Sequence, residues 1–165
     1  MVALKIEDIK TCTAKLFLGE EFDSFLMREA QIVTFNSFTI DGHIRKGYYT
    51  SQELEEKQME HLSYWKALRP FCFSLIKGKR LPERFSITLQ LPEREIARFL
   101  ERRGLSVSSE TIQALCMNIR YEEGTMSVVT ATSLAFFTLD KSIDMEWDGF
   151  VQEFLKTGGI AFTRE

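Results

Sequence analysis

The stretch "RFSITLQLP", Arg84 to Pro92, alternates apolar and polar side chains more cleanly than any other part of the chain. The apolar residues of one parity are Phe85, Ile87, Leu89 and Leu91, and the polar residues between them are Ser86, Thr88 and Gln90. A period of two predicts a β-strand with one face on the core and the other face more polar. Pro92 is typical of a helix start and Gly104 of a helix end, so a helix is expected to follow and to run to Arg103. The segment therefore predicts a one-sided sheet with helices joined to it.

A β-hairpin is expected upstream, in "AQIVTFNSFTIDGHI" (residues 30–44). Asp41-Gly42 is a strong signal for a two-residue turn, so the return strand would run from His43 to about Tyr49. The parity of the apolar residues changes at Asn36-Ser37, which indicates a bulge or a bend at that point.

A second hairpin is expected downstream, with arms at residues 110–121 and 125–138 around "EEGT". Together with the strand in residues 84–92, the two hairpins make about five strands, with helices before, between and after them. Strands that arrive as hairpins favour an α+β fold with one mostly antiparallel sheet over a βαβ series. The helices are expected to pack on this sheet.

Helical periodicity accounts for most of the remaining chain. The expected helices cover residues 5–18, 20–27, 51–68, 70–77, 92–103 and 142–157. Thr50 or Ser51 is the expected N-cap of the third helix. Pro70 fits the first turn of a separate fourth helix, and the alternative is one long helix that is kinked at Pro70.

Length and composition bound the class of protein. The 165 residues contain no repeat, low-complexity segment or linker, so a single domain over 1–165 is expected. The net charge of −3 argues against a general nucleic-acid coat protein. The three cysteines stand at long spacings, which indicates a reduced intracellular protein without a disulfide framework. No apolar run suits a signal peptide or a membrane helix, so a cytoplasmic location without membrane contact is expected.

Motifs for cofactors and metals are absent from the chain. It has no GxGxxG fingerprint, no Walker loop and no GxSxG elbow. The chain holds two histidines and shows neither DxDxDG nor HExxH spacing, so no metal site is predicted. We therefore expect neither a metal nor a cofactor.

Positive charge gathers in one segment that contains "LIKGKRLPERF" (residues 75–85). Residues 69–84 hold five basic side chains and one acidic side chain, a local charge of +4 in a chain of net charge −3. An anion is expected against the turn after Gly78. Its expected contacts are Arg69, Lys77, Lys79, Arg80 and Arg84, joined by Arg45 and Lys46 if the first hairpin folds beside them. The alternative is that these cations only favour the dipole of a helix C-terminus and stay in water.

Three classes of function remain open. The first is a non-enzymatic binding or interaction module, whose partner would be anionic: a nucleotide, a nucleic acid or an acidic protein. The second is a small enzyme that uses His43 beside Asp41 as an oriented base, or Cys72 as a nucleophile. The third is a structural homo-oligomer such as a homodimer, formed through a hairpin edge or an aromatic surface. The local basic segment favours the first class.

Five stretches together carry a resemblance to a known family. They are "LKIEDIK", "LFLGEEFDSFL", "FNSFTIDGHI", "WKALRPFCFSLIKGKRLPERFSITLQL" and "FFTLDKSIDMEWD". In combination they resemble a family of short proteins of unknown function from clostridial-type anaerobic bacteria, over nearly the whole chain. The resemblance implies a small, cytoplasmic, single-domain protein, and it implies no activity, cofactor or catalytic residue.

Overall fold

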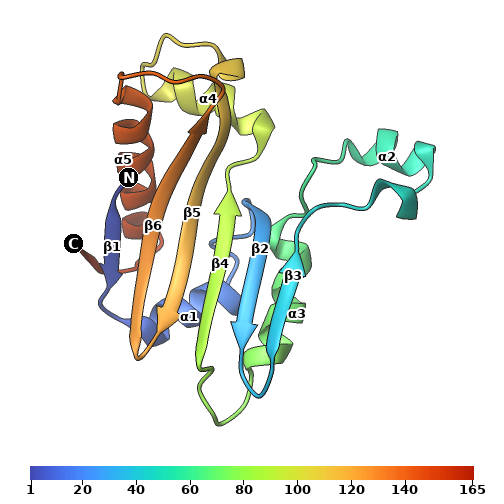
Figure 1. Ribbon diagram of the computed structural model, residues 1–165, viewed down its shortest axis with the longest axis vertical. Coiled ribbons are helices and arrows are strands. Elements are labelled where there is room, and N and C mark those ends of the chain that lie inside the picture. The colour runs from blue at the N-terminus through green and yellow to red at the C-terminus, as the bar shows by residue number, and fades with distance from the viewer.

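The computed structural model describes residues 1–165 as one seven-stranded sheet with helices packed on it (Figure 1). The strands are β1 (Ala3–Ile6), β2 (Leu26–Val33), β3 (Ser37–Asp41), β4 (Arg84–Gln90), β5 (Ile112–Glu122), β6 (Thr125–Leu134) and β7 (Phe162–Arg164). The α-helices are α1 (Ile9–Phe17), α2 (Ser51–Lys57), α3 (Trp65–Ile76), α4 (Glu93–Arg102) and α5 (Ser142–Thr157), and the 3-10 helices are η1 (Lys46–Tyr48) and η2 (Ser109–Thr111). The strand order is β3-β2-β4-β5-β6-β1-β7, and all neighbours are antiparallel. The predicted α+β class with an antiparallel sheet is confirmed.

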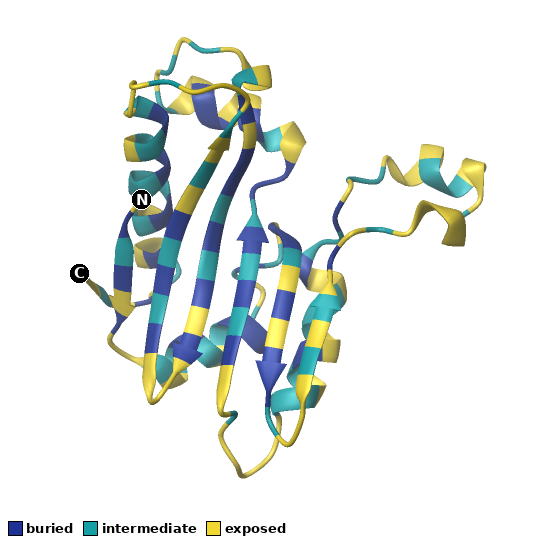
Figure 2. Ribbon diagram, in the orientation of Figure 1, coloured by how far each residue is buried: buried dark blue, intermediate teal, exposed yellow.

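The sheet buries one face only. In β4 the side chains of Phe85, Ile87 and Leu89 are buried, and the residues between them are partly exposed, as the alternation in the sequence predicts. Helices α1, α3 and α5 lie behind the sheet in Figure 1, and Figure 2 shows the strands striped by alternating burial. One continuous cluster of 32 buried residues fills the layer between the sheet and these helices, and it includes Ile96, Phe99 and Leu100 of α4. The opposite face of the central strands carries hydroxyl and amide groups, such as Asn118, whose Nδ2 donates to Ser86 Oγ at 2.9 Å.

The first hairpin is real, but its turn was misplaced. The chain reverses at residues 34–36, where Thr34 N donates to Asn36 O at 3.0 Å, so the change of parity marks the turn itself. Asp41-Gly42 ends β3 and makes no hairpin turn. The return strand over 43–49 is also absent: His43 forms an isolated bridge with Leu62, and the chain continues into an arm that carries η1 and α2 (Figure 1).

The N-terminal helix prediction was wrong at its start. The first residues form β1, and α1 begins only at Ile9, after the N-cap Asp8, whose Oδ1 accepts from Thr11 N at 3.0 Å. The helix expected over 20–27 is replaced by turns and by the start of β2. Strands β1 and β7 were not predicted, because four and three residues are too few to display a period. Their long-range pairing to β6 and to each other determines them.

The middle helices also differ from the prediction. Thr50 is the N-cap of α2 and forms a capping box with Glu53, but α2 ends at Lys57 instead of continuing to residue 68. Gln58 adopts a left-handed conformation (φ 45°), which stops the helix. Helix α3 then runs through Pro70, which lies in its second turn and not in its first. None of the helices is long and apolar enough to cross a membrane.

Candidate functional site

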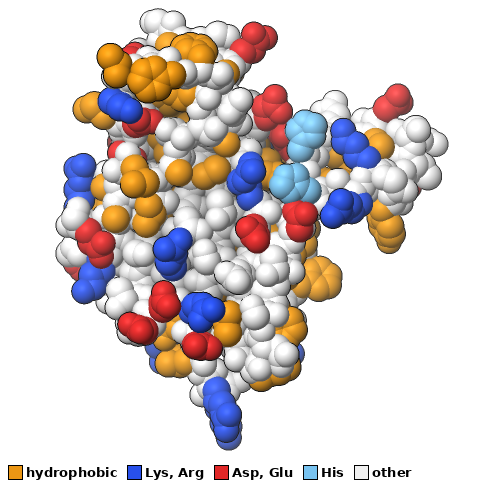
Figure 3. All heavy atoms as spheres, viewed as in Figure 1, with side chains coloured by type: hydrophobic (Ala, Val, Ile, Leu, Met, Phe, Trp, Pro, Cys, Tyr) orange, Lys and Arg blue, Asp and Glu red, His pale blue; other side chains and the backbone are white.

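The predicted basic turn links α3 to β4 at the lower tip of the molecule, where Figure 3 shows a basic side chain projecting. Gly78 lies in this turn with a backbone φ of 131°, a conformation that residues with a Cβ atom rarely adopt. No carboxylate lies within ion-pair distance of Lys77, Lys79 or Arg80, whereas Arg84 contacts Glu83 at 3.6 Å. The turn therefore presents three cations without acidic partners.

Arg69 was expected at the same site, but it serves the fold. Its Nε and Nη2 donate to the two carboxylate oxygens of Asp23 at 2.9 and 2.8 Å. Both side chains are mostly buried, with 16% and 13% exposed. The hydrogen bond to Asp23 raises the pKa of Arg69 further above its ordinary value. This bidentate ion pair leaves few guanidinium N–H groups of Arg69 free to bind a ligand.

Arg45 and Lys46 do not fold beside the basic turn. They lie in the arm after β3, whereas the basic turn lies next to the 34–36 turn at the opposite end of β3 (Figure 1). Arg45 instead contacts Asp41, with Nη2 3.7 Å from Oδ2. The condition attached to these two residues is therefore not met.

The basic turn borders an apolar groove that the sequence analysis did not find. The groove has a volume of about 750 Å³ and lies between α1, the end of α3 and the turn. Its lining residues are Ile9, Lys10, Thr13, Ala14, Phe17, Leu18, Phe73, Ile76, Lys77, Gly78, Arg80, Leu81, Pro82, Phe85, Tyr121 and Gly124. The charged members are Lys10, Lys77 and Arg80, and no acidic residue is among them. The groove thus combines an apolar interior with positive charge alone.

Aromatic packing holds the base of this groove in place. The ring of Phe85 stacks on Tyr121 at 5.4 Å and meets Phe17 edge-on at 5.4 Å. Phe17 also packs against Trp65, whose Nε1 donates to Leu16 O at 2.9 Å and joins α3 to α1. Residues from the first helix and from two strands more than sixty positions later therefore meet here. No local motif in the sequence signals this meeting.

Asp41 and His43 lie at the other end of β3, in a polar hollow of about 450 Å³. His43 Nδ1 is 2.7 Å from Asp41 Oδ1, and the His43 backbone N–H donates to the same oxygen at 2.9 Å. These two hydrogen bonds lower the pKa of Asp41. The hollow is completed by Arg28, Glu29, Thr39 and Thr88. An aspartate that orients an imidazole is the arrangement expected of a general base, and both side chains are 54% exposed.

The chain's two histidines come together at the base of the arm. Ile44 N donates to His61 O at 2.9 Å, next to the bridge between His43 and Leu62. Figure 3 shows the two histidine side chains beside each other, with acidic and basic groups nearby. No group of three or more His, Cys, Asp or Glu side chains is placed to hold a metal ion.

Most of the chain matches one known protein family. The model of a family of unknown function, DUF5721, matches residues 15–163. The chain belongs to this family. The resemblance to a family of unknown function is thereby confirmed, while the bacterial group attached to it stays a prediction. Neither a curated protein nor a solved structure matches the chain significantly.

Two of the three cysteines of this DUF5721 member, Cys12 and Cys72, are completely buried. Cys72, the predicted nucleophile, is completely buried, and burial raises the pKa of its thiol to about 12. Burial likewise raises the pKa of Cys12 to about 12, with a further contribution from Asp8. A nucleophilic cysteine needs a lowered pKa and access to solvent, and Cys72 has neither.

Thiol labelling checks this conclusion. Under native conditions at pH 8, we expect an aromatic disulfide reagent to leave Cys12 and Cys72 unmodified, because both thiols are buried and protonated. Cys116 is the control, since it is only half-buried and should react first. In 6 M guanidinium chloride all three thiols should react at similar rates. Rapid native labelling of Cys72, measured by mass spectrometry, would restore the nucleophile hypothesis.

Two features of the surface suit self-association. Three large apolar side chains of the segment after β6 are exposed: Phe136, Phe137 and Leu139. Strand β3 also forms a free edge of the sheet. Exposed apolar groups and free edges are features of contact surfaces. A homodimer therefore stays a prediction, as does an acidic protein partner.

Proposed function

We propose that this chain is a binding protein for a small anionic amphiphile, held in the apolar groove beside the basic turn. The observation that carries the proposal is the coincidence of three cations with an apolar groove that contains no acidic residue. An apolar ligand body would cover the side chains that line the groove. Its acidic group would then lie among Lys10, Lys77 and Arg80.

The dimensions of the groove suit a small molecule. Ligand pockets commonly measure about 300–1,000 Å³ and are lined mainly by apolar side chains with few polar groups. At about 750 Å³ the groove lies inside this range. Thr13 and the hydroxyl of Tyr121 are the only uncharged polar groups among the side chains of the lining, so a nucleobase would find few hydrogen-bonding partners there. This composition supports an acid with an apolar tail over a nucleotide or a nucleic acid.

The charges are arranged for recognition of one acidic group. Lys10 comes from α1, whereas Lys77 and Arg80 come from the turn, so cations of two separate elements line the same groove. Since no carboxylate pairs with any of them, a bound anion would not need to displace an existing ion pair. Such exposed contacts weaken as salt screens them, so binding should fall with ionic strength.

The polar hollow at His43 offers weaker support for the enzyme alternative. The pair Asp41–His43 stays more than half exposed, so water surrounds the imidazole. The other side chains of the hollow include no activated nucleophile: Arg28 and Glu29 are charged, and the remaining two are threonines. We therefore favour the groove as the functional site.

Calorimetric titration with decanoate, below its micelle concentration, tests the proposal. We expect decanoate to bind and 1-decanol to bind about tenfold more weakly. The double variant Lys77→Gln/Arg80→Gln should lose about tenfold in affinity for decanoate, because each exposed cation contributes up to about 1 kcal/mol.

Lys66→Gln is the matched control for this experiment. It removes one exposed lysine from α3, the helix that ends next to Lys77, but lies outside the groove. We expect its affinity to equal that of the parent. Equal affinities of the parent and the double variant would contradict the proposal.

A further inference from the structure

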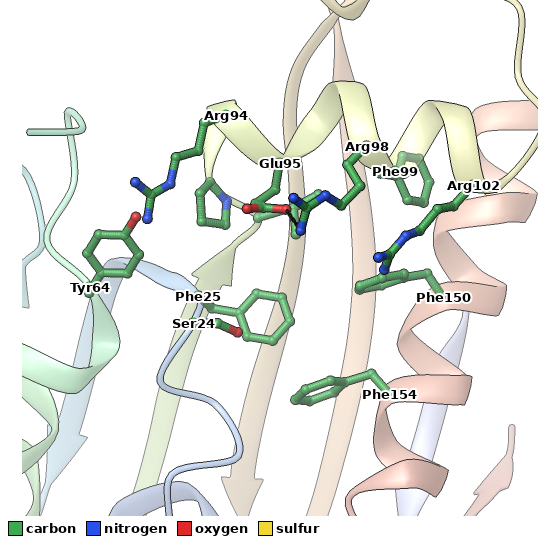
Figure 4. Close-up of a pocket in the computed structure, with 12 residues that line it drawn as sticks. Ser24, Phe25, Tyr64, Arg94, Glu95, Arg98, Phe99, Arg102, Phe150 and Phe154 are labelled. Carbon is green, nitrogen blue, oxygen red and sulfur yellow. Dashed lines mark ion pairs between the residues drawn. The ribbon is translucent and has the colours of Figure 1, made fainter. Parts of the chain in front are cut away.

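We propose a second ligand site for a small aromatic acid, in a hollow where three arginines of α4 face three phenylalanines (Figure 4). The hollow measures about 350 Å³ and lies between α4, α5 and the segment that enters β2. Arg94, Arg98 and Arg102 extend into it from α4. Phe25, Phe150 and Phe154 lie below them in the same view. None of these residues lines the groove at the basic turn.

The arginines form a row because of their spacing. Positions 94, 98 and 102 are four residues apart, and this spacing brings side chains to one side of an α-helix. Glu95 contacts Arg98, with 3.5 Å between Oε2 and Nη1, whereas Arg94 and Arg102 have no carboxylate within ion-pair distance. The hollow is therefore lined by three cations and one anion, and two of the cations are uncompensated.

Arg103, on the same helix, has a structural role. Its Nε is 3.1 Å from a carboxylate oxygen of Glu146, and its Nη1 is 2.9 Å from one of Glu153. It thereby joins α4 to α5. In contrast, Arg94 and Arg102, which face the hollow, form no ion pair with a carboxylate of α5. This difference between adjacent positions indicates that the row is available to a ligand.

The phenylalanines below the arginines pack against neighbouring rings, and two of them are partly uncovered. Phe150 stacks on the buried Trp147 at 5.1 Å, and Phe154 meets Phe25 edge-on at 5.0 Å. Phe150 and Phe154 are nevertheless only half-buried, so ring surface faces the hollow. A flat ring placed there would gain offset or edge contacts with these phenylalanines.

Tyr64 adds an unsatisfied polar group at one end of the hollow. Its hydroxyl oxygen is buried and has no hydrogen-bond partner, and the Arg94 guanidinium lies 5.6 Å from its ring (Figure 4). A buried hydroxyl without a partner is costly, so an acceptor from a ligand would be favourable there. Burial also raises the pKa of Tyr64, which keeps the hydroxyl protonated as a donor.

These groups select the ligand by its chemistry. Guanidinium groups bind carboxylates and phosphates through paired hydrogen bonds, and the phenylalanines favour a flat apolar body. The ligand class is therefore an aromatic ring system that carries one acidic group. The groove at the basic turn is larger and suits a longer flexible tail, so the two sites should prefer different probes.

Titration with 2-naphthoate, followed by calorimetry and by amide shifts in NMR spectra, tests this site. We expect 2-naphthoate to bind at least tenfold more tightly than 2-naphthamide and than inorganic phosphate. The largest shifts should fall in α4, in α5 and around residues 24–25 and 64. The double variant Arg94→Met/Arg102→Met should lose at least tenfold in affinity, and Phe150→Leu should lose about fivefold.

Two controls keep the outcome interpretable. Arg120→Met removes an exposed, unpaired arginine from β5, and Lys77→Gln/Arg80→Gln alters the other site, so both should bind 2-naphthoate like the parent. Arg94 and Arg102 make no ion pair, so their replacement should lower the thermal unfolding midpoint only slightly, through loss of the contact between Arg94 and the Tyr64 ring. The site is refuted if 2-naphthoate fails to bind, if phosphate binds equally well, or if the Arg94/Arg102 variant retains full affinity.

Discussion

Replacing Trp147 by alanine should lower the free energy of unfolding by about 4 kcal/mol. The indole is completely buried in α5 and packs against Phe99 at 5.8 Å and Phe150 at 5.1 Å. Its Nε1 donates to Cys116 O at 2.8 Å and so joins α5 to β5. Alanine would leave a large cavity and remove this hydrogen bond. Urea unfolding, monitored by far-ultraviolet circular dichroism, measures the loss.

Trp147→Phe separates the two contributions. Phenylalanine keeps most of the ring contacts but cannot donate to Cys116, so we expect a smaller loss of about 1–2 kcal/mol. The ordering of the two variants is the informative result. If the alanine variant is no less stable than the phenylalanine variant, Trp147 does not hold α5 on the sheet as the structure indicates.

Replacing Gly42 by alanine should destabilise the protein by about 2–3 kcal/mol, because no space exists for a Cβ atom. A Cβ built on Gly42 would lie 1.7 Å from the carbonyl oxygen of Met27 and 2.7 Å from its carbonyl carbon. Both atoms belong to the backbone of β2, next to the irregularity between Met27 and Glu29. Because they are backbone atoms, no side-chain rotation can relieve the clash. The end of β3 would have to move away, together with the hydrogen bond from Gly42 N to Arg28 O.

Gly47→Ala is the matched control for this substitution. Gly47 lies only five residues further along the arm, and no heavy atom lies within 4 Å of the position of its Cβ. We expect its free energy of unfolding to stay within about 0.5 kcal/mol of the parent. Equal stabilities of the Gly42 and Gly47 variants in thermal and urea unfolding would show that β3 does not pass this close to β2.

Gly42 also explains why the first hairpin was misplaced. Asp41-Gly42 is the usual dipeptide of a tight turn, but here the glycine is required by close contact between two strands. The turn itself uses residues 34–36, which carry no such dipeptide. The turn preference of a dipeptide depends on local sequence and takes no account of contacts with distant strands. The dipeptide therefore predicted the turn at residues 41–42 instead of residues 34–36.

The rest of the fold was predictable wherever a period was long enough. Strand β4, the β5–β6 hairpin and α4 follow from alternation, from "EEGT" and from the pair Pro92 and Gly104. Strands β1 and β7 depend on pairing across more than 100 residues of chain, which no local pattern reports. Helix α3 passes through Pro70 because burial of Trp65 and Cys72 outweighs the lost backbone donor.

The candidate sites were predictable only in part. The charge count led to Lys77 and Arg80, yet it also included Arg69, which pairs with Asp23, a residue forty-six positions away. The apolar groove remained hidden because its lining comes from α1, α3 and three later segments. The four-residue spacing of Arg94, Arg98 and Arg102 is visible in the sequence. The phenylalanines that they face come from other elements, chiefly α5, and only the tertiary structure brings them together.

The most direct test of the central proposal maps where decanoate binds, by the shifts of backbone amides in two-dimensional NMR spectra of the parent protein. We predict saturable shifts concentrated in residues 9–18 and 73–85 and at Tyr121, the segments that line the groove. The same shifts should be reduced in the Lys77→Gln/Arg80→Gln variant at equal ligand concentration. Absence of saturable shifts, or shifts concentrated around Asp41 and His43 instead, would contradict the proposal that the basic turn and its groove form the binding site.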